Sequence, residues 1–578
     1  MRRPSAALPA LAVLSLLMAA CGTPVDTAQP IAATPVSPAA PPAPPAPPPV
    51  PAPVTSEQVT VTGSSIRQKS LAHVRPSPTL IYGGPFIAPG ADKFPDAQAN
   101  KAVLVAEQPV STFSSDVDTA SYAFVRRQLT AGRMPPAAAV RVEEMVNYFP
   151  YTYARPATRT QPFALTTEVM PSPWQRENQL LHIAVRGFDL QAAARPPLNV
   201  VLLVDVSGSM GPPDRLPLLK QGFRLLADGL RPQDRVAIVT YASGTAVALE
   251  PTSGQDKQKI IDAIDALGAG GSTAGSEGLQ RAYALAERHF DKGAVNRILL
   301  ATDGDFNVGI TDPRELEKFV ADKRKSGVYL SILGVGSGNL NDALIQRLTQ
   351  SGNGNAAYID SLLEARKALG EELGSTMFPI ANDVKMQVEF NPARVAAYRL
   401  IGYETRMLAR QDFKDDKVDA GDMGAGHTVT AIYEITPASA AGTLVDPLRY
   451  GGGKQPAPAS ASASAPAFAS KSDELCFVRV RYKLPGESSS RLAEQPVRAG
   501  SARSALAAAP PDQRFAVAVA AFGQRLRGEP QVADYSYADI ADLANGARGA
   551  DTEGYRAEFV RLVRLTESMG KAGQNGQP

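Results

Sequence analysis

Two patterns of apolar and polar positions occur along the chain, one typical of strands and one typical of helices, and together they mark the folded segments. Between residues 198 and 360, short apolar runs alternate with segments whose apolar residues recur every three or four positions. This alternation predicts an α/β fold with a doubly wound, mostly parallel sheet covered by helices on both faces. The strands are expected to begin at Asn199, Arg235, Ala246, Asn296, Val328 and Ala356, and the helices at Pro217, Gln255, Ser276, Arg314 and Asp342.

The segments on either side of this region have a mixed pattern. Helical periodicity after polar capping residues predicts helices within 111–129 and 139–149, and a period of two predicts a pair of strands within 163–190. After the central region, further strands are expected from Asp383, Val395, His427 and Leu475, followed by helices from Arg514, Tyr535 and Thr552. We expect the strands from both sides to form one β-sandwich, with the central domain inserted at its end.

The N-terminus has the pattern of an export signal. Arg2 and Arg3 precede an apolar run over 7–20, which is too short for a comfortable membrane span, and small residues lead to Cys21. This segment resembles the lipobox of bacterial lipoproteins, which implies that Cys21 becomes the lipidated first residue. Gly22 in place of Asp resembles the outer-membrane sorting class. The alternative is an ordinary secretory signal with a cysteine near its cleavage site.

A proline-rich stretch at 35–54 favours extended polyproline II structure and indicates a disordered stalk after the anchor. We therefore expect a lipoprotein of the bacterial cell envelope, in the outer membrane and facing the periplasm. The predicted divisions, in chain order, are a signal peptide (1–20), a lipidated N-terminus with a Pro/Ala-rich linker (21–110), an N-terminal flanking domain (111–196), a central domain (197–375) and a C-terminal domain (376–578). The C-terminal domain is expected to contain a low-complexity surface loop at 451–472.

Composition removes several functional classes. The 59 basic and 57 acidic residues leave a net charge of +2 without a long basic run, so nucleic acid is not an expected partner. The four histidines stand singly, outside metal-ligand spacings. The second cysteine, Cys476, lies in a strand-like segment and is expected to be buried and structural.

Side chains with oxygen atoms follow the first strand of the central region. Asp205, Ser207 and Ser209 recur at a period of two, so an extended chain directs them to one side. Asp303 ends the fourth strand, and Thr273 stands just before a helix. Ligands of doubly wound sheets collect at the carboxyl ends of the strands, and these oxygens suit a hard cation.

The sequences DVSGSM, GGSTAGSEGL and ATDGDFNVG together resemble the metal-ion-dependent adhesion site of the von Willebrand factor A (VWA) domain, which has a Rossmann-like fold. The resemblance implies Mg²⁺ as the cofactor, with Mn²⁺ or Ca²⁺ as alternatives. It also implies that the metal binds an acidic residue of a partner protein. The implied metal ligands, some acting through water, are Asp205, Ser207, Ser209, Thr273 and Asp303. Helix capping and turn formation would explain each of the three sequences singly.

Residues 111–570 as a whole resemble the bacterial VWA lipoproteins. We therefore expect a non-enzymatic protein that binds an unidentified partner through Mg²⁺. In some VWA domains the last helix moves, and here it is expected at 362–375.

Two other functions stay open. One is a structural platform whose metal site is unoccupied. The other is a metal-dependent phosphohydrolase, which Ser207 disfavours because haloacid-dehalogenase-like enzymes carry a second Asp at that position. A calcium-binding EF-hand at Asp303 is rejected because Arg314 stands where a bidentate Glu is needed. Asp305 and Asn307 are instead expected to shape the rim of the site.

Overall fold

The computed structural model describes residues 92–115, 118–158, 160–191, 194–272, 277–304, 312–371, 377–440 and 473–575. The predicted signal, Cys21, the proline-rich linker and the loop at 451–472 lie outside these residues. So do Thr273, Asp305 and Asn307. Within the described parts, no helix is long and apolar enough to cross a membrane.

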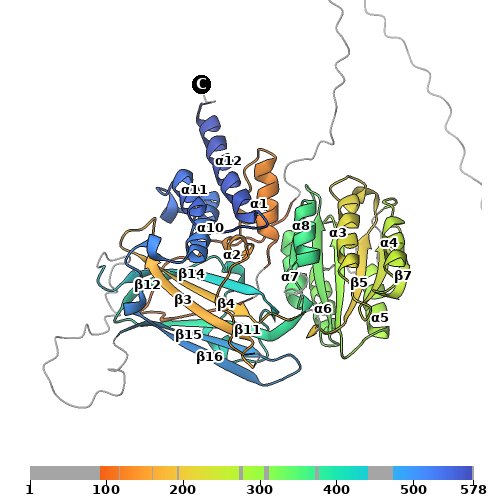
Figure 1. The fold of residues 1–578 in the computed structure, drawn as a ribbon, viewed down its shortest axis with the longest axis horizontal. Coiled ribbons are helices and arrows are strands. Elements are labelled where there is room, and N and C mark those ends of the chain that lie inside the picture. Colours follow the sequence, from red (N-terminus) through yellow and green to blue (C-terminus); the bar gives the residue numbers. More distant parts are fainter. Residues whose placement is uncertain are drawn as a thin grey trace, which may run out of the picture. The chain divides into compact units, whose positions relative to one another are not determined.

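Figure 1 shows the central domain as a sheet covered by helices. The sheet has six strands in the order β10-β9-β8-β5-β6-β7. Strand β5 pairs in parallel with β6 on one side and with β8 on the other, whereas β7 runs antiparallel to β6. The predicted doubly wound, mostly parallel sheet is confirmed. Its strands are β5 (Leu198–Asp205), β6 (Arg235–Tyr241), β7 (Thr245–Ser253), β8 (Val295–Thr302), β9 (Val328–Val335) and β10 (Ala356–Ile359).

Helices cover both faces of this sheet, which explains why β5 is apolar at nearly every position. Val200, Leu202 and Val204 face a core shared with α3, α4 and α8, whereas Val201 and Leu203 face a core shared with α5, α6 and α7. Helix α8 continues as a π-helical turn at Lys367–Glu371. The helices are α3 (Leu216–Asp228), α4 (Lys257–Asp265), α5 (Gly278–Arg288), α6 (Pro313–Arg324), α7 (Asp342–Ser351) and α8 (Leu362–Arg366).

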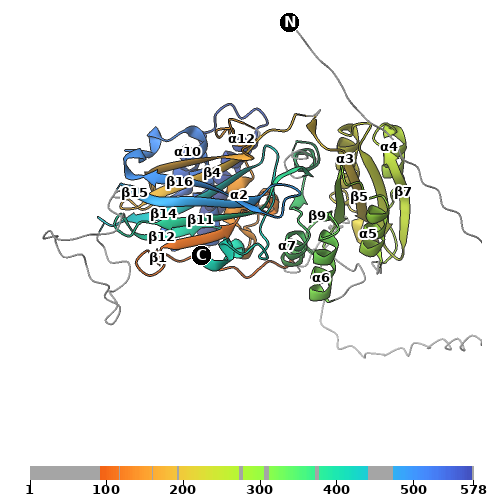
Figure 2. The same ribbon diagram turned by 90° about the horizontal axis from the view of Figure 1, so that it is seen from below.

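Strands from both sides of the central domain form two sheets around a shared core (Figure 2). The first has the order β1-β12-β14-β4-β3, and the second has the order β13-β11-β15-β16, with β2 also on β11. The antiparallel pairing of β4 with β14 joins segments that flank the central domain, so the predicted pairing is confirmed. The strands are β1 (Val103–Leu104), β2 (Val110–Ser114), β3 (Phe163–Pro171), β4 (Gln179–Gly187), β11 (Pro379–Phe390), β12 (Val395–Ile401), β13 (Met423–Gly424), β14 (Thr428–Pro437), β15 (Glu474–Lys483) and β16 (Ser490–Arg498).

The first predicted helix is confirmed, but the first of the residues expected to precede it form a strand. Residues Val110–Ser114 form β2 rather than capping a helix, and α1 begins only at Ala120 (Ala120–Thr130). The hydroxyl groups of β2 have partners inside the fold: Ser111 Oγ accepts from Tyr433 at 2.9 Å, and Thr112 Oγ1 accepts from Gln387 at 3.0 Å. Pairing with a distant strand thus outweighs the local capping preference.

Cys476, on β15, is buried as predicted, and burial raises the pKa of its thiol.

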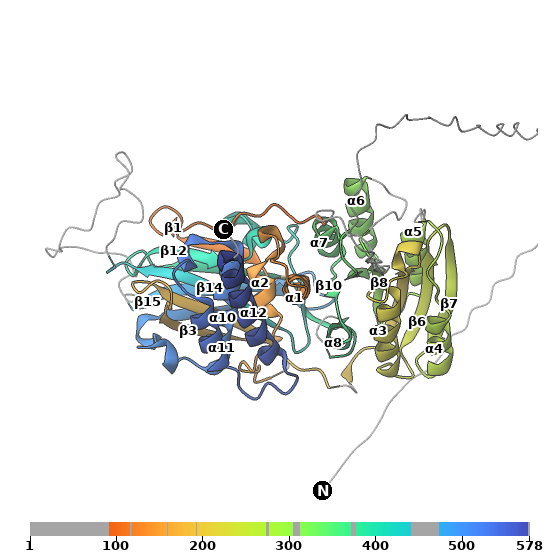
Figure 3. The same ribbon diagram turned by 90° about the horizontal axis from the view of Figure 1, so that it is seen from above.

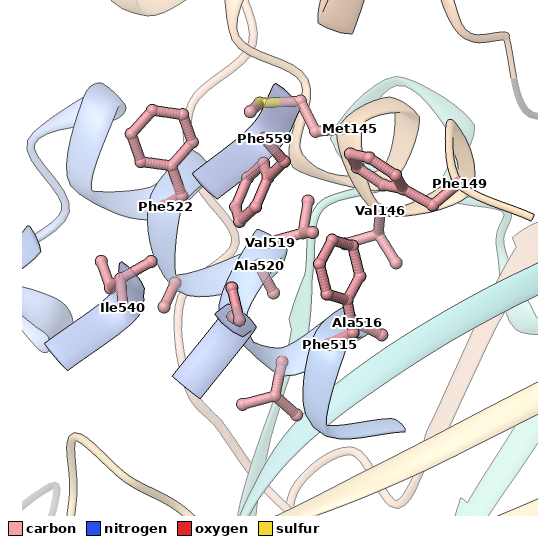
Figure 4. Packing of buried hydrophobic residues seen from close by; sticks show 14 of the residues in the cluster. Met145, Val146, Phe149, Phe515, Ala516, Val519, Ala520, Phe522, Ile540 and Phe559 are labelled. Atoms are coloured by element: carbon pink, nitrogen blue, oxygen red, sulfur yellow. The ribbon is translucent and has the colours of Figure 1, made fainter. Parts of the chain in front are cut away.

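The flanking helices are α2 (Val142–Asn147), α10 (Pro511–Arg527), α11 (Tyr537–Asn545) and α12 (Tyr555–Asn575). Figure 3 shows the three C-terminal helices gathered over the flanking strands. They share a core with α2, in which the rings of Phe149, Phe515 and Phe559 meet edge to face (Figure 4). The ring centroids of Phe149 and Phe515 are 4.9 Å apart. The N-terminal and C-terminal flanking segments are therefore held together by aromatic packing as well as by strand pairing.

Replacing Phe559 by alanine should lower the free energy of unfolding by about 3–5 kcal/mol, because it removes a fully buried ring from this core. The denaturant midpoint of the transition reported by Trp174 fluorescence measures the change. Leu565→Ala is the matched control, since Leu565 lies on the same helix and is 38% exposed. Equal midpoints for the two variants would contradict the assigned packing.

Candidate metal centre

Asp205 is the last residue of β5, a strand with parallel neighbours on both sides. Its carboxylate is buried, and Oδ1 accepts a hydrogen bond from the backbone N–H of Ser207 at 2.8 Å. This bond turns the chain at once, so that the hydroxyls of Ser207 and Ser209 lie 3.0 Å apart. The structure thus brings these three predicted site residues together on one turn.

Asp303 follows β8, the neighbour of β5, in a register that pairs Val204 with Ala301. The parallel pairing brings both aspartates to one sheet edge, and both are buried. Burial raises the pKa of Asp205; hydrogen bonds from Ser207 oppose the shift, and the charge of Asp303 adds to it.

One oxygen of each aspartate lacks a hydrogen-bond donor. Asp205 Oδ2 and Asp303 Oδ1 are both buried without a hydrogen-bond partner at bonding distance among the described residues. The Tyr241 hydroxyl is also buried without a partner, and its interaction with Asp205 opposes the rise in the pKa of that carboxyl. Leaving carboxylate oxygens buried and unsatisfied is costly, and a cation bound between them would remove that cost. The described residues contain no cluster of three or more His, Cys, Asp or Glu side chains suited to a metal. The donors at this edge are carboxylates and hydroxyls, which fit a hard, oxygen-binding cation.

Thr273 lies outside the described residues, but the loop leading to it is fixed to the turn after β5. The N–H of Gly270 donates to Val206 O at 2.8 Å, and the N–H of Gly208 donates to Gly271 O at 3.0 Å. Gly271 has a φ of +80°, a conformation that favours glycine. The loop between α4 and α5 therefore reaches the same edge as Asp205.

Arg215, the N-cap residue of α3, is a site residue that sequence reasoning missed. Its Nη1 donates to Asp303 Oδ2 and, at 2.8 Å, to Ser209 O; its Nη2 donates to Ser337 O at 3.3 Å. One guanidinium thus bridges the segments that follow β5, β8 and β9. The available signal was an arginine ten residues after Asp205, but nothing in that spacing distinguishes it from an ordinary helix-start residue.

Helix α1 also reaches the rim of this site. Arg127 donates to Asp214 Oδ2 at 2.6 Å, to Ser337 Oγ at 2.9 Å and to the hydroxyl of Tyr358 at 2.7 Å. Asp214 directly precedes Arg215, so a residue of the N-terminal flanking segment holds the loop that carries Arg215.

The preceding residue of α1, Arg126, contacts a different part of the fold. It forms ion pairs with Asp360, with Glu364 at 2.8 Å and with Glu558 at 3.1 Å. Glu364 belongs to α8, and Glu558 belongs to α12. Arg126 therefore joins the central domain to the C-terminal helices.

Comparison with known proteins defines the class. A family model of the von Willebrand factor type A domain matches residues 199–370, and another, described as von Willebrand factor, matches 88–182. A third, described as the C-terminal part of the uncharacterized protein YfbK, matches 375–569. The molecule is a VWA-domain protein, as its fold indicated. Such domains are typical of adhesion and protein–protein interaction.

The protein is 44% identical over 492 residues to the uncharacterized protein YfbK of Escherichia coli K12, a match that spans 84% of this chain and 83% of that protein. The chain belongs to the YfbK family.

Solved structures with a related fold include a von Willebrand factor type A protein from Catenulispora acidiphila. It is 16% identical, with a TM-score of 0.38, and the match covers 70% of this chain and 91% of that one. Proximal thread matrix protein 1 from the mussel byssus, solved with a zinc-occupied adhesion-site motif, is 24% identical with a TM-score of 0.26. That match covers 32% of this chain and 46% of that one.

Gly271→Ala should destabilise the loop that leads to Thr273 by about 1–2 kcal/mol, because alanine is strained at this positive φ. Its Cβ would also lie 2.5 Å from Ser243 Oγ. Limited proteolysis of the native protein should show faster cleavage in this loop. Gly268→Ala is the control, since a Cβ there meets no atom within 4 Å; equal cleavage of the two variants would show that the loop is not anchored at Gly271.

Proposed function

We propose that this protein is a cell-envelope lipoprotein whose VWA domain binds an acidic group of a partner protein through Mg²⁺, with Mn²⁺ or Ca²⁺ as alternatives. The observation that carries the proposal is the pair of buried oxygens without donors, Asp205 Oδ2 at the end of β5 and Asp303 Oδ1 just after the adjacent parallel strand β8. The residues that would hold the metal are Asp205, Ser207, Ser209, Thr273 and Asp303.

The chain's own residues suit an adhesive contact. A bound Mg²⁺ would supply a coordination position open to an incoming carboxylate. Asp205 and Asp303 would balance the charge of the ion, and the hydroxyls of Ser207 and Ser209 would contribute neutral oxygens. Ser209 is exposed, so this side of the site faces the solvent from which a partner would approach.

Two of the described histidines, His182 and His289, lie away from this edge. His182 lies in the flanking sandwich on β4, where burial lowers its pKa to about 4 and its ring meets the hydroxyl of Tyr153 at 3.2 Å. His289 lies at the opposite end of the central sheet, where its carbonyl accepts from Asn199 near the start of β5. These positions favour a non-enzymatic role, with metal-dependent phosphate release as the alternative to be tested.

Asp205→Ala and Thr273→Ala should each weaken Mg²⁺ or Mn²⁺ binding by roughly 100-fold or more, because each removes an oxygen ligand from a small site. Titration calorimetry on the full-length protein in detergent measures the loss. Asp265→Asn is the control, since Asp265 forms a surface ion pair with Arg224.

Retained binding in the Asp205→Ala and Thr273→Ala variants would place the metal elsewhere. A folded protein without any saturable metal binding would instead favour the structural platform. Capture of a partner that chelator abolishes supports adhesion, whereas metal-dependent phosphate release without a partner supports the phosphohydrolase.

The membrane anchor is proposed from the N-terminal sequence, in which small residues precede Cys21 after an apolar run. Lipidation there would tether the folded domains to the outer membrane by the proline-rich stalk, facing the periplasm.

Cys21→Ser should move the protein from the membrane fraction to the soluble fraction and abolish labelling by a palmitate analogue. Cys476→Ser is the control, because Cys476 is buried in β15. A Cys21→Ser protein that still incorporates the label would contradict the assignment.

A further inference from the structure

The turn between β5 and α3 brings a positive charge into the candidate metal centre. We propose that Arg215 is an internal cation of this site, which weakens metal binding and in exchange gives the metal-loaded site a net positive charge for acidic ligands. This inference rests on the proposed function, because it assumes that a divalent metal binds between Asp205 and Asp303.

The contacts place the guanidinium inside the site. The side chain of Asp303 is fully buried and that of Arg215 is 16% exposed, so their ion pair is largely shielded from water. Asp303 Oδ2 accepts a hydrogen bond from Arg215, whereas Asp303 Oδ1 has no hydrogen-bond partner among the described residues. The same carboxylate can therefore face the guanidinium with one oxygen and a metal with the other.

Two further contacts keep Arg215 at this edge independently of Asp303. Its acceptors at 2.8 and 3.3 Å are the backbone carbonyls of Ser209 and Ser337, which cannot be protonated or titrated away. The neighbouring carboxylate in sequence, Asp214, is engaged by Arg127 at 2.6 Å. Asp303 is thus the carboxylate that pairs with Arg215, and the positive charge stays beside the metal position.

Formal charges show the consequence. Asp205, Asp303 and Arg215 together carry one net negative charge, so a divalent ion leaves the site with one positive charge. A single carboxylate from a ligand then makes the whole neutral. Without Arg215 the loaded site would be neutral, and the ligand would add an unbalanced negative charge. Arg215 therefore lowers the affinity of the site for the metal and raises the affinity of the metal-loaded site for an acidic ligand.

The test is titration of Mn²⁺ into the full-length protein in detergent. Arg215→Gln should bind Mn²⁺ roughly tenfold more tightly or better, because a like charge a few ångströms from the ion is removed in a partly buried site. Arg215→Lys retains the charge and should stay within about threefold of the unchanged protein. Arg224→Gln removes an arginine from the exposed side of the same helix and should have no effect.

The ligand half is tested with acetate, titrated into Mn²⁺-saturated protein and followed by water-proton relaxation. The unchanged protein should bind acetate more tightly than Arg215→Gln. No difference between the two, including no binding to either, overturns this half. Thermal unfolding in metal-free buffer checks that Arg215→Gln is folded, and Arg215→Met, which preserves the apolar stem, replaces it if it is not.

The outcomes separate this inference from the proposed function. If neither the unchanged protein nor Arg215→Gln shows saturable Mn²⁺ binding, the proposed function fails. If the unchanged protein binds Mn²⁺ and Arg215→Gln binds equally or more weakly, the proposed function survives and the role given to Arg215 is overturned. An Arg215→Lys variant that binds as tightly as Arg215→Gln also overturns it, because charge would then not be the cause.

Discussion

The parallel pairing of β5 with β8 is the constraint on which the site depends. It brings Asp205 and Asp303, nearly a hundred positions apart in sequence, to one sheet edge, where both become buried. Two buried carboxylates at close range repel each other, and each also loses hydration. Hydrogen bonds from the N–H of Ser207 and the guanidinium of Arg215 offset part of this unfavourable energy. The two oxygens left without donors are the feature on which the proposed cation site rests.

The flanking segments form one structural unit although the VWA domain separates them in sequence. Strand β4 pairs with β14, and β2 pairs with β11, so each sheet contains chain from both sides of the insertion. The phenylalanine core joins α2 to α10 and α12 in the same way. An inserted domain tied at both ends to one body has less freedom than a domain on a flexible linker. The orientation of the candidate metal centre is accordingly governed by the flanking fold.

Local patterns were sufficient to predict the sheet and the grouping of oxygens after β5, but Gly208–Met210 form a 3-10 turn rather than the extended chain that was expected. The apolar runs, their spacing and the period of two in Asp205, Ser207 and Ser209 are all encoded within a few residues. Arg215 and Arg127 could not be found in this way, because their partners Asp303 and Ser337 are brought near only by the folded sheet. Tertiary pairing also turned Val110–Ser114 into a strand against its capping pattern. The edge strand β16 escaped prediction because it is mostly exposed and contains Pro496. The roles of Thr273 and Cys21 stay predictions.

The two consecutive arginines of α1 have a consequence for how modular this VWA domain is. Neighbouring residues of a helix point about 100° apart, so Arg126 and Arg127 form ion pairs with different parts of the same domain. A fragment cut at the conventional limits of the VWA domain would lose both arginines, and with them the ion pairs that Arg126 forms with Glu364 and that Arg127 forms with Asp214. Here the family boundary drawn on sequence is not a physical boundary. Ion pairs tie the VWA domain to helix α1, which precedes it in the chain.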